Sequence, residues 1–179
     1  MVQPVVIADY DPKWPSLYEE EKARILGALG TKMVAIEHIG STAVPGLAAK
    51  AIIDMMVGVA ALSDAERCIG PMITLGYRYR PEMEDTMPER RYFTRGGVKG
   101  DSHHLHMVQM GSPFWERHLL FRNYLRTHGE VAQEYQRLKL ELAARYGTDR
   151  DGYSDAKTPF IRGVEEKARG ERPPSLFSQ

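Results

Sequence analysis

Three consecutive residues, Gly40, Ser41 and Thr42, form the part of the sequence best suited to chemistry. Glycine has no Cβ, so a ligand can approach its backbone closely, and the two hydroxyls can donate to phosphate oxygens together with exposed backbone amides. Residues 43–47 follow, with a proline and a glycine that are typical of a defined loop. The pattern predicts a phosphate-binding turn. The alternative is a tight turn closed by local hydroxyl hydrogen bonds.

Asp54 is the second candidate, because it interrupts the otherwise apolar run over residues 51–59. An unpaired carboxylate in a buried strand is costly and normally has a cationic partner or a metal ion. We therefore expect Asp54 and Ser41 to act together as catalytic residues, which requires the two segments to meet within a side chain's reach. The alternative is that Asp54 forms a structural ion pair with Lys50 or with an arginine.

Histidines supply a third set of candidates. His104 and His106 stand two residues apart, hence on the same face of a strand, and His38 precedes the glycine–serine turn. Together with Asp54 they could form a metal site suited to manganese, zinc or iron. The alternative is a hydrogen-bonded or half-exposed pair, because His-x-His alone fixes no complete ligand geometry. His103 is expected to face the other way, into solvent.

Composition restricts the class of protein. The chain has 179 residues, 42% of them hydrophobic and 27% charged, which fits a globular fold with a substantial core. Its 24 basic and 24 acidic residues cancel, which argues against sequence-specific binding of nucleic acid but not against a small anionic ligand. A single cysteine requires no oxidising compartment. With no membrane-spanning stretch and no secretory signal at the start, we expect a cytoplasmic protein.

The periodicity of apolar residues predicts an α/β (α+β) protein, with one domain over residues 1–170 and a flexible tail over residues 171–179. Charged residues 19–22 are expected to form a solvated helix face. The expected strands cover residues 5–8, 33–39, 51–59, 77–80, 91–95 and 103–109, and the expected helices cover residues 16–29, 63–75, 112–127, 130–146 and 158–168. The first two thirds are therefore rich in strands, and the final third is helical.

A resemblance to the GrpB family rests on residues 38–47, HIGSTAVPGL, followed by Lys50 and by Ile52-Ile53-Asp54. That family is similar to the DNA polymerase beta-like nucleotidyltransferases, and in some bacteria its domain is fused to dephospho-CoA kinase. The resemblance implies a nucleotidyltransferase-like mixed β-sheet with flanking helices, and it suggests a link to coenzyme A metabolism. It continues through Gly76-Tyr77, Arg91-Tyr92-Phe93, His104-Leu105-His106, residues 121–126 and residues 157–161, and so covers nearly the whole chain.

The resemblance to the superfamily implies two features. The Gly40-Ser41 turn would hold a nucleoside triphosphate, and a pair of acids on the following strand would hold magnesium. Asp54 fits the first acid. Met56 stands where the second acid should be, two residues later on the same strand face, and methionine cannot ligate magnesium. One acid with substrate phosphates can bind a single Mg²⁺ or Mn²⁺ without supporting a two-metal transfer mechanism.

The resemblance also selects the cations that would neutralise phosphate, namely Lys50, Arg91 and Lys157. Arg122 and Arg126, one helical turn apart, are second candidates. For each of these residues the alternative is a solvated surface charge.

Three functions are compatible with these residues. The first is a nucleotidyltransferase-like protein that binds a nucleoside triphosphate or a related phosphorylated metabolite on the glycine–serine turn and Lys50, with a divalent metal on Asp54 and an acceptor that the sequence does not name. The second is a noncatalytic nucleotide-binding or phosphometabolite-binding module, favoured by Met56. The third is a histidine-assisted metal-dependent hydrolase that uses His104 and His106.

Overall fold

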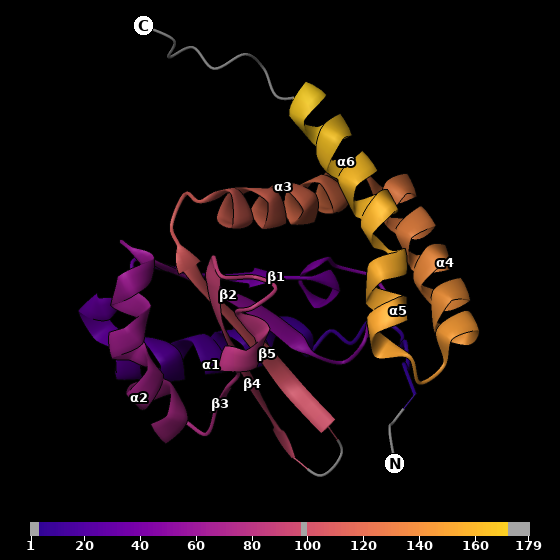
Figure 1. The fold of residues 1–179 in the computed structure, drawn as a ribbon. Coiled ribbons are helices and arrows are strands. Elements are labelled where there is room, and N and C mark those ends of the chain that lie inside the picture. The colour runs from indigo at the N-terminus through magenta and orange to yellow at the C-terminus, as the bar shows by residue number, and fades with distance from the viewer. Residues whose placement is uncertain (1–3, 98–99, 172–179) are drawn as a thin grey trace, which may run out of the picture.

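A five-stranded mixed sheet runs through the centre of the computed structural model, which describes residues 4–97 and 100–171 (Figure 1). The strands lie in the order β1-β2-β5-β4-β3, in which β2 and β5 are parallel and all other neighbours are antiparallel. The predicted mixed sheet is therefore confirmed. The strand bounds are β1 (Ala35–Ile39), β2 (Ile53–Val59), β3 (Arg78–Tyr79), β4 (Arg90–Gly97) and β5 (Gly100–Gln109).

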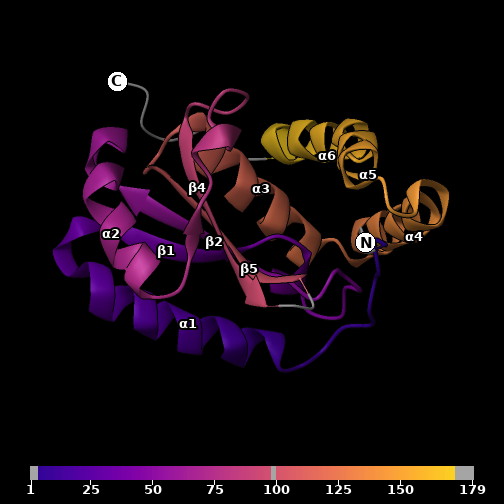
Figure 2. The same cartoon turned by 60° about the horizontal axis from the view of Figure 1, so that its bottom comes forward.

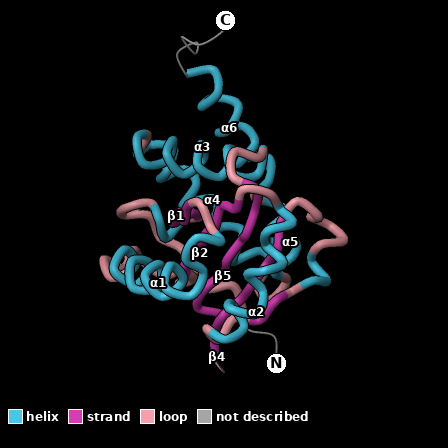
Figure 3. The backbone as a smooth tube through the Cα atoms, turned by 90° about the vertical axis from the view of Figure 1, so that its left-hand side faces the viewer, coloured by secondary structure: helices cyan, strands magenta, loops and turns pink. Residues whose placement is uncertain are grey.

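Helices cover both faces of this sheet. Figure 2 shows α1 and α2 on one side and α3 on the other, and α6 reaches past the end of α3 in Figures 1 and 3. None of the helices within the described residues has the length and apolar character needed to cross a membrane. The helix bounds are α1 (Trp14–Leu29), α2 (Glu66–Thr74), α3 (Pro113–Thr127), α4 (Gly129–Tyr146), α5 (Arg150–Ala156) and α6 (Thr158–Glu171).

Strand β2 is apolar along its length because helices pack on both of its faces. Met55 and Val57 point into the core that the strands share with α1 and α2. Met56 points the other way and packs with Phe114 and Trp115 of α3. Successive side chains of a strand alternate between faces, so this pattern assigns every residue of the central strands to one side of the sheet.

Near the start of the described chain, one predicted strand and one predicted helix differ from the structure. The strand expected over residues 5–8 reduces to one bridge between Ala8 and Ala49, because the Val5 amide donates to the carbonyl of Gly147 instead. Helix α1 begins two residues earlier than expected, and the hydroxyl of Ser16 donates to the Lys13 carbonyl rather than capping the helix.

The final third is helical as predicted, but it contains one helix more than expected. The side chain of Asp149 caps α5 by accepting a hydrogen bond from the Gly152 amide at 2.9 Å, which starts a helix of seven residues. Glu171, the first residue of the tail expected over residues 171–179, belongs to α6. Residues 172–179 lie outside the described part of the chain.

Two expectations about solvent exposure are wrong, and one buried carboxylate explains both. Glu21, expected on a solvated helix face, is 3% exposed and bonds to Arg24, to the Tyr77 hydroxyl at 2.9 Å and to Arg95 at 2.8 Å. His103, expected in solvent, is 9% exposed beside Arg95, because α1 covers this face of β5. Burial and the neighbouring guanidinium of Arg95 lower the pKa of His103 to about 4.

Replacing Glu21 by alanine should lower the free energy of unfolding by about 3 to 5 kcal/mol, because the partly buried guanidinium of Arg95 would lose its carboxylate and the buried Tyr77 hydroxyl would lose its acceptor. Glu20, its exposed neighbour on α1, is the matched control and should change stability by less than about 0.5 kcal/mol as Glu20→Ala. Urea unfolding at pH 7 measures both values. Equal losses in the two variants would contradict a structural role for the Glu21 carboxylate.

Candidate functional site

The turn after β1 passes directly over the carboxylate of Asp54. Ile39, the last residue of β1, pairs with Asp54 across the sheet, so the chain leaves the sheet beside this residue. Gly40 has a φ of 73°, and a Cβ at this position would lie 2.6 Å from Oδ2 of Asp54. Only glycine therefore allows this approach. The structure thus brings the glycine–serine turn and the acid into contact.

Asp54 is neither sealed in the core nor paired with an arginine or lysine. Its side chain is 31% exposed, and its partner is His104, whose Nδ1 lies 3.2 Å from Oδ1 of Asp54. The two residues are register partners on the parallel strands β2 and β5. No lysine or arginine nitrogen within the described residues approaches the Asp54 carboxylate to 4.0 Å, so the structural ion pair considered for Asp54 does not form.

Three lysines converge on the pocket beside this carboxylate. Lys50 precedes β2, Lys139 lies on α4, and Lys157 lies between α5 and α6. With Ser41 and Asp54 they line a small cavity of about 70 Å³. The ammonium groups of Lys50 and Lys157 lie 4.3 and 4.4 Å from the centre of the Tyr153 ring, and Lys139 donates to the carbonyl of Ala48. The lining contains one carboxylate for three cations.

The surroundings of these lysines disfavour their protonated forms. Burial lowers the pKa of Lys157 to about 8, and repulsion from Lys50 adds to the effect. Burial and repulsion from Lys157 lower the pKa of Lys139 to about 7. Burial also lowers the pKa of Lys50, with a further contribution from Arg150. A bound anion would relieve the repulsion and restore the charged forms.

The two hydroxyls of the turn have different surroundings. Ser41 lines the cavity and forms a side-chain hydrogen bond with the buried Tyr135 of α4. Thr42 is buried, and its hydroxyl donates to the Ile52 carbonyl at 3.1 Å while accepting from Nε2 of His38 at 2.9 Å. Thr42 also lines the cavity, but the single proton of its hydroxyl is donated to the Ile52 carbonyl, so Thr42 holds the loop and does not donate to a phosphate.

The structure does not gather the predicted metal ligands. His38 pairs with Met55 and stacks on Tyr18 at 4.7 Å, which puts its ring on the face of the sheet opposite Asp54. Burial lowers the pKa of His38 to about 4. His106 is on the same face as Asp54, but its Nδ1 lies 2.7 Å from a nitrogen of Arg90, as suits an acceptor of that guanidinium.

Of the four proposed ligands, only Asp54 and His104 are therefore neighbours. Across residues 4–97 and 100–171, no group of three or more histidine, cysteine, aspartate or glutamate side chains is arranged to hold a metal ion. His104 has a second carboxylate nearby, with its Nε2 3.7 Å from Oδ2 of Asp101. His104 therefore lies within 4.0 Å of two carboxylates, and both His104 and His106 are partly exposed, which fits the half-exposed alternative considered for the histidine pair.

Met56 occupies the position at which a second acid was expected, and it is part of the core. Its side chain is 0% exposed and packs with Ile39, Val108, Phe114 and Trp115. The site therefore contains one strand carboxylate, with a dry apolar contact between the sheet and α3 directly beside it.

A family model described as GrpB protein matches residues 4–167. The chain belongs to the GrpB family. The UPF0157 protein YqkA of Bacillus subtilis is 42% identical over 165 residues, which are 92% of this chain and 47% of YqkA, so the chain spans about half the length of that relative. A dephospho-CoA kinase of Mycolicibacterium paratuberculosis is 26% identical over 189 residues, which cover 92% of this chain and 46% of the kinase.

Solved structures agree with this membership. The crystal structure of the conserved protein GrpB from Enterococcus faecalis superposes with a TM-score of 0.82 at 35% identity, covering 93% of this chain and 98% of that one. The Cid1 poly(U) polymerase superposes with a TM-score of 0.51 at 11% identity, covering 78% of this chain and 43% of that one. At this low identity the second likeness shows a nucleotidyltransferase-like fold and nothing about chemistry.

The arginines that sequence reasoning selected have structural partners in this GrpB-family chain. Arg91 lies on the opposite face of the sheet from Asp54 and pairs with Glu66 at 2.8 Å and Glu84 at 3.2 Å, so its predicted role in phosphate binding does not fit its position.

From α3, Arg122 bonds to Glu37 at 2.6 Å and to the His38 carbonyl at 2.9 Å. Arg126 donates to the Ala43 carbonyl at 2.8 Å. Both arginines therefore hold β1 and its turn against α3, and neither lines the lysine pocket.

Lys139 is the site residue that sequence reasoning missed. It lies four residues after Tyr135 and three before Leu142, and both of those positions belong to the apolar stripe of α4. A lysine on the buried face of a helix was the available signal, because such a residue needs an internal partner. The sequence does not show which distant segment α4 packs against, and so it does not identify the partner of Lys139.

Gly40→Ala should be much more damaging than Gly46→Ala. Both glycines have positive φ values, 73° and 78°, but nothing lies within 4 Å of a Cβ at Gly46. We expect the control Gly46→Ala to cost about 1 to 2 kcal/mol from the backbone alone, and Gly40→Ala to cost about 1 to 3 kcal/mol more because it displaces Asp54. Urea unfolding measures the difference, and equal losses would rule out tight contact between the turn and Asp54.

Proposed function

We propose that this chain is a nucleotidyltransferase-like protein that binds a nucleoside triphosphate or a related phosphorylated metabolite in the pocket lined by Lys50, Lys139 and Lys157. The single observation that carries the proposal is the convergence of these three lysines, from three separate segments, on a cavity to which the described residues contribute one acid, Asp54. Such a cluster is unfavourable without an anion, and a phosphate chain supplies several negative oxygens.

The turn and the lysines have complementary roles in this proposal. The phosphate chain lies against the backbone of Gly40 and the hydroxyl of Ser41, which line the same cavity as the ammonium groups or adjoin it. The lysines neutralise the phosphates as point charges, and no side chain at Gly40 obstructs the approach. The proposal retains Lys50 and Lys157 as phosphate-binding residues and adds Lys139. It no longer assigns phosphate binding to Arg91 or Thr42.

Asp54 is the residue that would hold a divalent metal, Mg²⁺ or Mn²⁺. Its carboxylate is partly exposed at the cavity, which fits an ion that binds through one protein carboxylate and substrate phosphates. The metal would neutralise charge on the phosphates when bound. His104 stabilises the orientation of the Asp54 carboxylate through the 3.2 Å contact.

The likenesses to other proteins support the ligand class in general terms. One structure of Cid1 is a complex with the UTP analogue UMPNPP, and its chain superposes on this one with a TM-score of 0.50 at 14% identity. The partial match to dephospho-CoA kinase supports the same ligand class and a link to coenzyme A metabolism, because the substrate that this enzyme's name states is a phosphorylated metabolite.

A second candidate function is binding without catalysis, and the burial of Met56 favours it. The position of a second metal-binding acid is filled by a fully buried methionine in contact with Phe114 and Trp115, so a second ion has no carboxylate on this strand. A protein with one acid binds a metal–phosphate complex but lacks the ligands that would stabilise both the attacking and the leaving oxygen.

Incubation with each nucleoside triphosphate and Mg²⁺ or Mn²⁺ separates the two functions. Binding should raise the melting temperature of the protein, and Asp54→Ala should remove the metal-dependent part of that rise, because a ligand that binds only the native state stabilises it by mass action. Release of pyrophosphate with an acceptor present indicates transfer, and stabilisation without release indicates a binding module. Absence of stabilisation by any phosphorylated ligand would refute the proposed function.

Affinity for sulfate, used as a probe of the lysine pocket, should fall as the pH is raised from 7 to 9. The pKa values of Lys139 and Lys157, about 7 and about 8, mean that both lose their charge over this range. Sulfate does not titrate there, so the change reports the protein. Isothermal titration calorimetry measures the affinity.

Lys157→Met and Lys167→Met form a matched pair for this measurement. Lys157 lines the pocket, whereas Lys167 is exposed on α6. We expect Lys157→Met to weaken sulfate binding about tenfold, which corresponds to about 1.4 kcal/mol, and Lys167→Met to leave it unchanged. A pH-independent affinity, or equal affinities in both variants, would show that sulfate binds elsewhere.

A further inference from the structure

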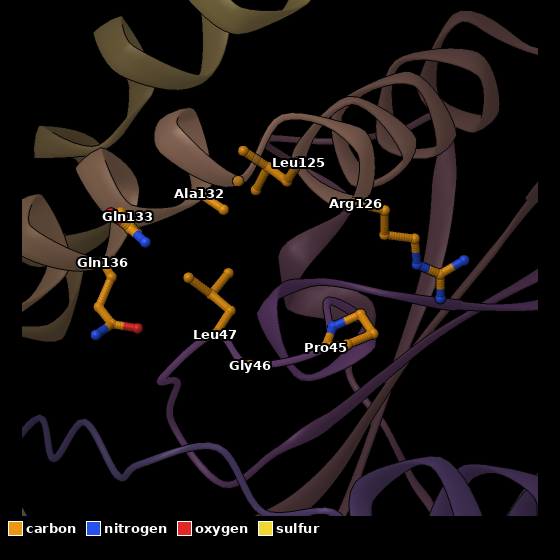
Figure 4. Close-up of a pocket in the computed structure, with 9 residues that line it drawn as sticks. Pro45, Gly46, Leu47, Leu125, Arg126, Ala132, Gln133 and Gln136 are labelled. Carbon is orange, nitrogen blue, oxygen red and sulfur yellow. The ribbon is translucent and has the colours of Figure 1, made fainter.

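A second and larger pocket lies between the loop after the glycine–serine turn, the end of α3 and the first turns of α4 (Figure 4). Its volume is about 540 Å³, within the range of pockets that hold a nucleoside-sized molecule. It shares no lining residue with the lysine pocket. The lining is made of Pro45, Gly46, Leu47, Leu125, Arg126, Gly129, Ala132, Gln133 and Gln136.

The walls of this pocket are mostly apolar or uncharged, with one cation at the edge, Arg126. Leu47, Leu125 and Ala132 supply apolar surface, and the lining contains no lysine, histidine or acid. Its single charged residue, Arg126, donates through Nε to the Ala43 carbonyl. Figure 4 shows the guanidinium of Arg126 turned away from Leu47 and from the glutamines. A ligand for this pocket is therefore uncharged and apolar on its faces, unlike the ligand of the lysine pocket.

Two carboxamides on one face of α4 supply the hydrogen-bonding groups. Gln136 is held in place because its Oε1 accepts from the Ala48 amide at 2.8 Å, which leaves its NH₂ group for a ligand. Gln133 lies one turn earlier and is exposed, and its carboxamide has no partner within the part of the chain that the structure describes. A carboxamide presents a donor and an acceptor side by side, as the edge of a nucleobase does.

We propose that this pocket binds an uncharged planar heterocycle, a nucleobase or its nucleoside, with the ring between the apolar side chains and its edge on Gln133 and Gln136. The paired donor and acceptor of Gln133 match an adenine edge, which glutamine recognises through two hydrogen bonds. Because the guanidinium of Arg126 is turned away from Leu47 and from the glutamines (Figure 4), a ligand between these side chains meets apolar groups and carboxamides rather than a phosphate-binding cation. This site is independent of the anion binding proposed above, because it uses none of the three lysines.

The two pockets are nevertheless held by the same helix. Gln136 accepts from the amide of Ala48, and Lys139, one turn later on α4, donates to the carbonyl of Ala48. The segment between the two pockets is therefore held through both the amide and the carbonyl of Ala48. Adenosine has no phosphate, so it tests the pocket at Gln133 and Gln136 without binding to the lysines.

Titration of adenosine into the full chain, followed by nuclear magnetic resonance of backbone and side-chain amides, tests the proposal. We expect saturable shifts in the NH₂ signals of Gln133 and Gln136 and in the amide of Gly129. Gln133→Ala should weaken adenosine binding about tenfold, because two hydrogen bonds to the base edge are lost. Glu134→Ala, an exposed change at the next position of α4, is the control and should keep the affinity of the unaltered chain.

A second variant keeps the test independent of Gln133. Ala132→Leu adds volume to the pocket wall and should also prevent adenosine binding, whereas Lys157→Met should not affect it. The proposal is overturned if adenosine produces no saturable shift, if Gln133→Ala and Glu134→Ala bind equally well, or if Lys157→Met abolishes binding. The last result would assign the nucleoside to the lysine pocket.

Discussion

The lack of a side chain at Gly40 allows the turn after β1 to cross the Asp54 carboxylate at close range. Ile39 pairs with Asp54 in the sheet, so the position of the turn is determined by strand register rather than by the loop itself. A shift of one residue would turn Asp54 into the core and Met55 or Ile53 toward the cavity. The buried contacts on both faces of β2 prevent that shift, and the site depends on them.

Three partly buried arginines elsewhere in the protein have a carboxylate partner, which the lysines of the pocket lack among the described residues. Arg91, Arg95 and Arg122 each have a carboxylate within 3 Å. The lysines at the pocket instead face one another, an aromatic ring and one carbonyl. A lysine whose pKa is lowered on folding reduces stability fully below that lowered pKa, and the penalty disappears as the pH rises toward the value of the unfolded chain. Near neutral pH the charges of Lys139 and Lys157 therefore lower the stability of the fold, as is common at binding sites.

Local patterns were sufficient for the α/β class and the helical final third, since alternation and capping residues act locally. The mixed sheet and the shared site of the glycine–serine turn and Asp54 were implied by the family resemblance. The sequence was insufficient for the long-range partners. Arg91 and Lys139 are both charged residues in amphipathic segments, and only tertiary packing shows that the first meets Glu66 and the second meets Ala48. His38 precedes the turn in sequence, yet strand alternation puts its ring behind the sheet, which adjacency in the chain could not reveal.

The lysine pocket is formed by residues that lie far apart in the sequence. Ser41, Lys50 and Asp54 belong to the first third, whereas Lys139 and Lys157 arrive with the last helices. During synthesis the segments that contain Ser41 and Asp54 leave the ribosome before those helices, because the chain emerges from its N-terminus onward. A nascent chain would thus have the acid and the turn but no competence to retain an anion until α4 and the residues around 157 have docked. Binding of an anion would therefore indicate that the domain has finished folding.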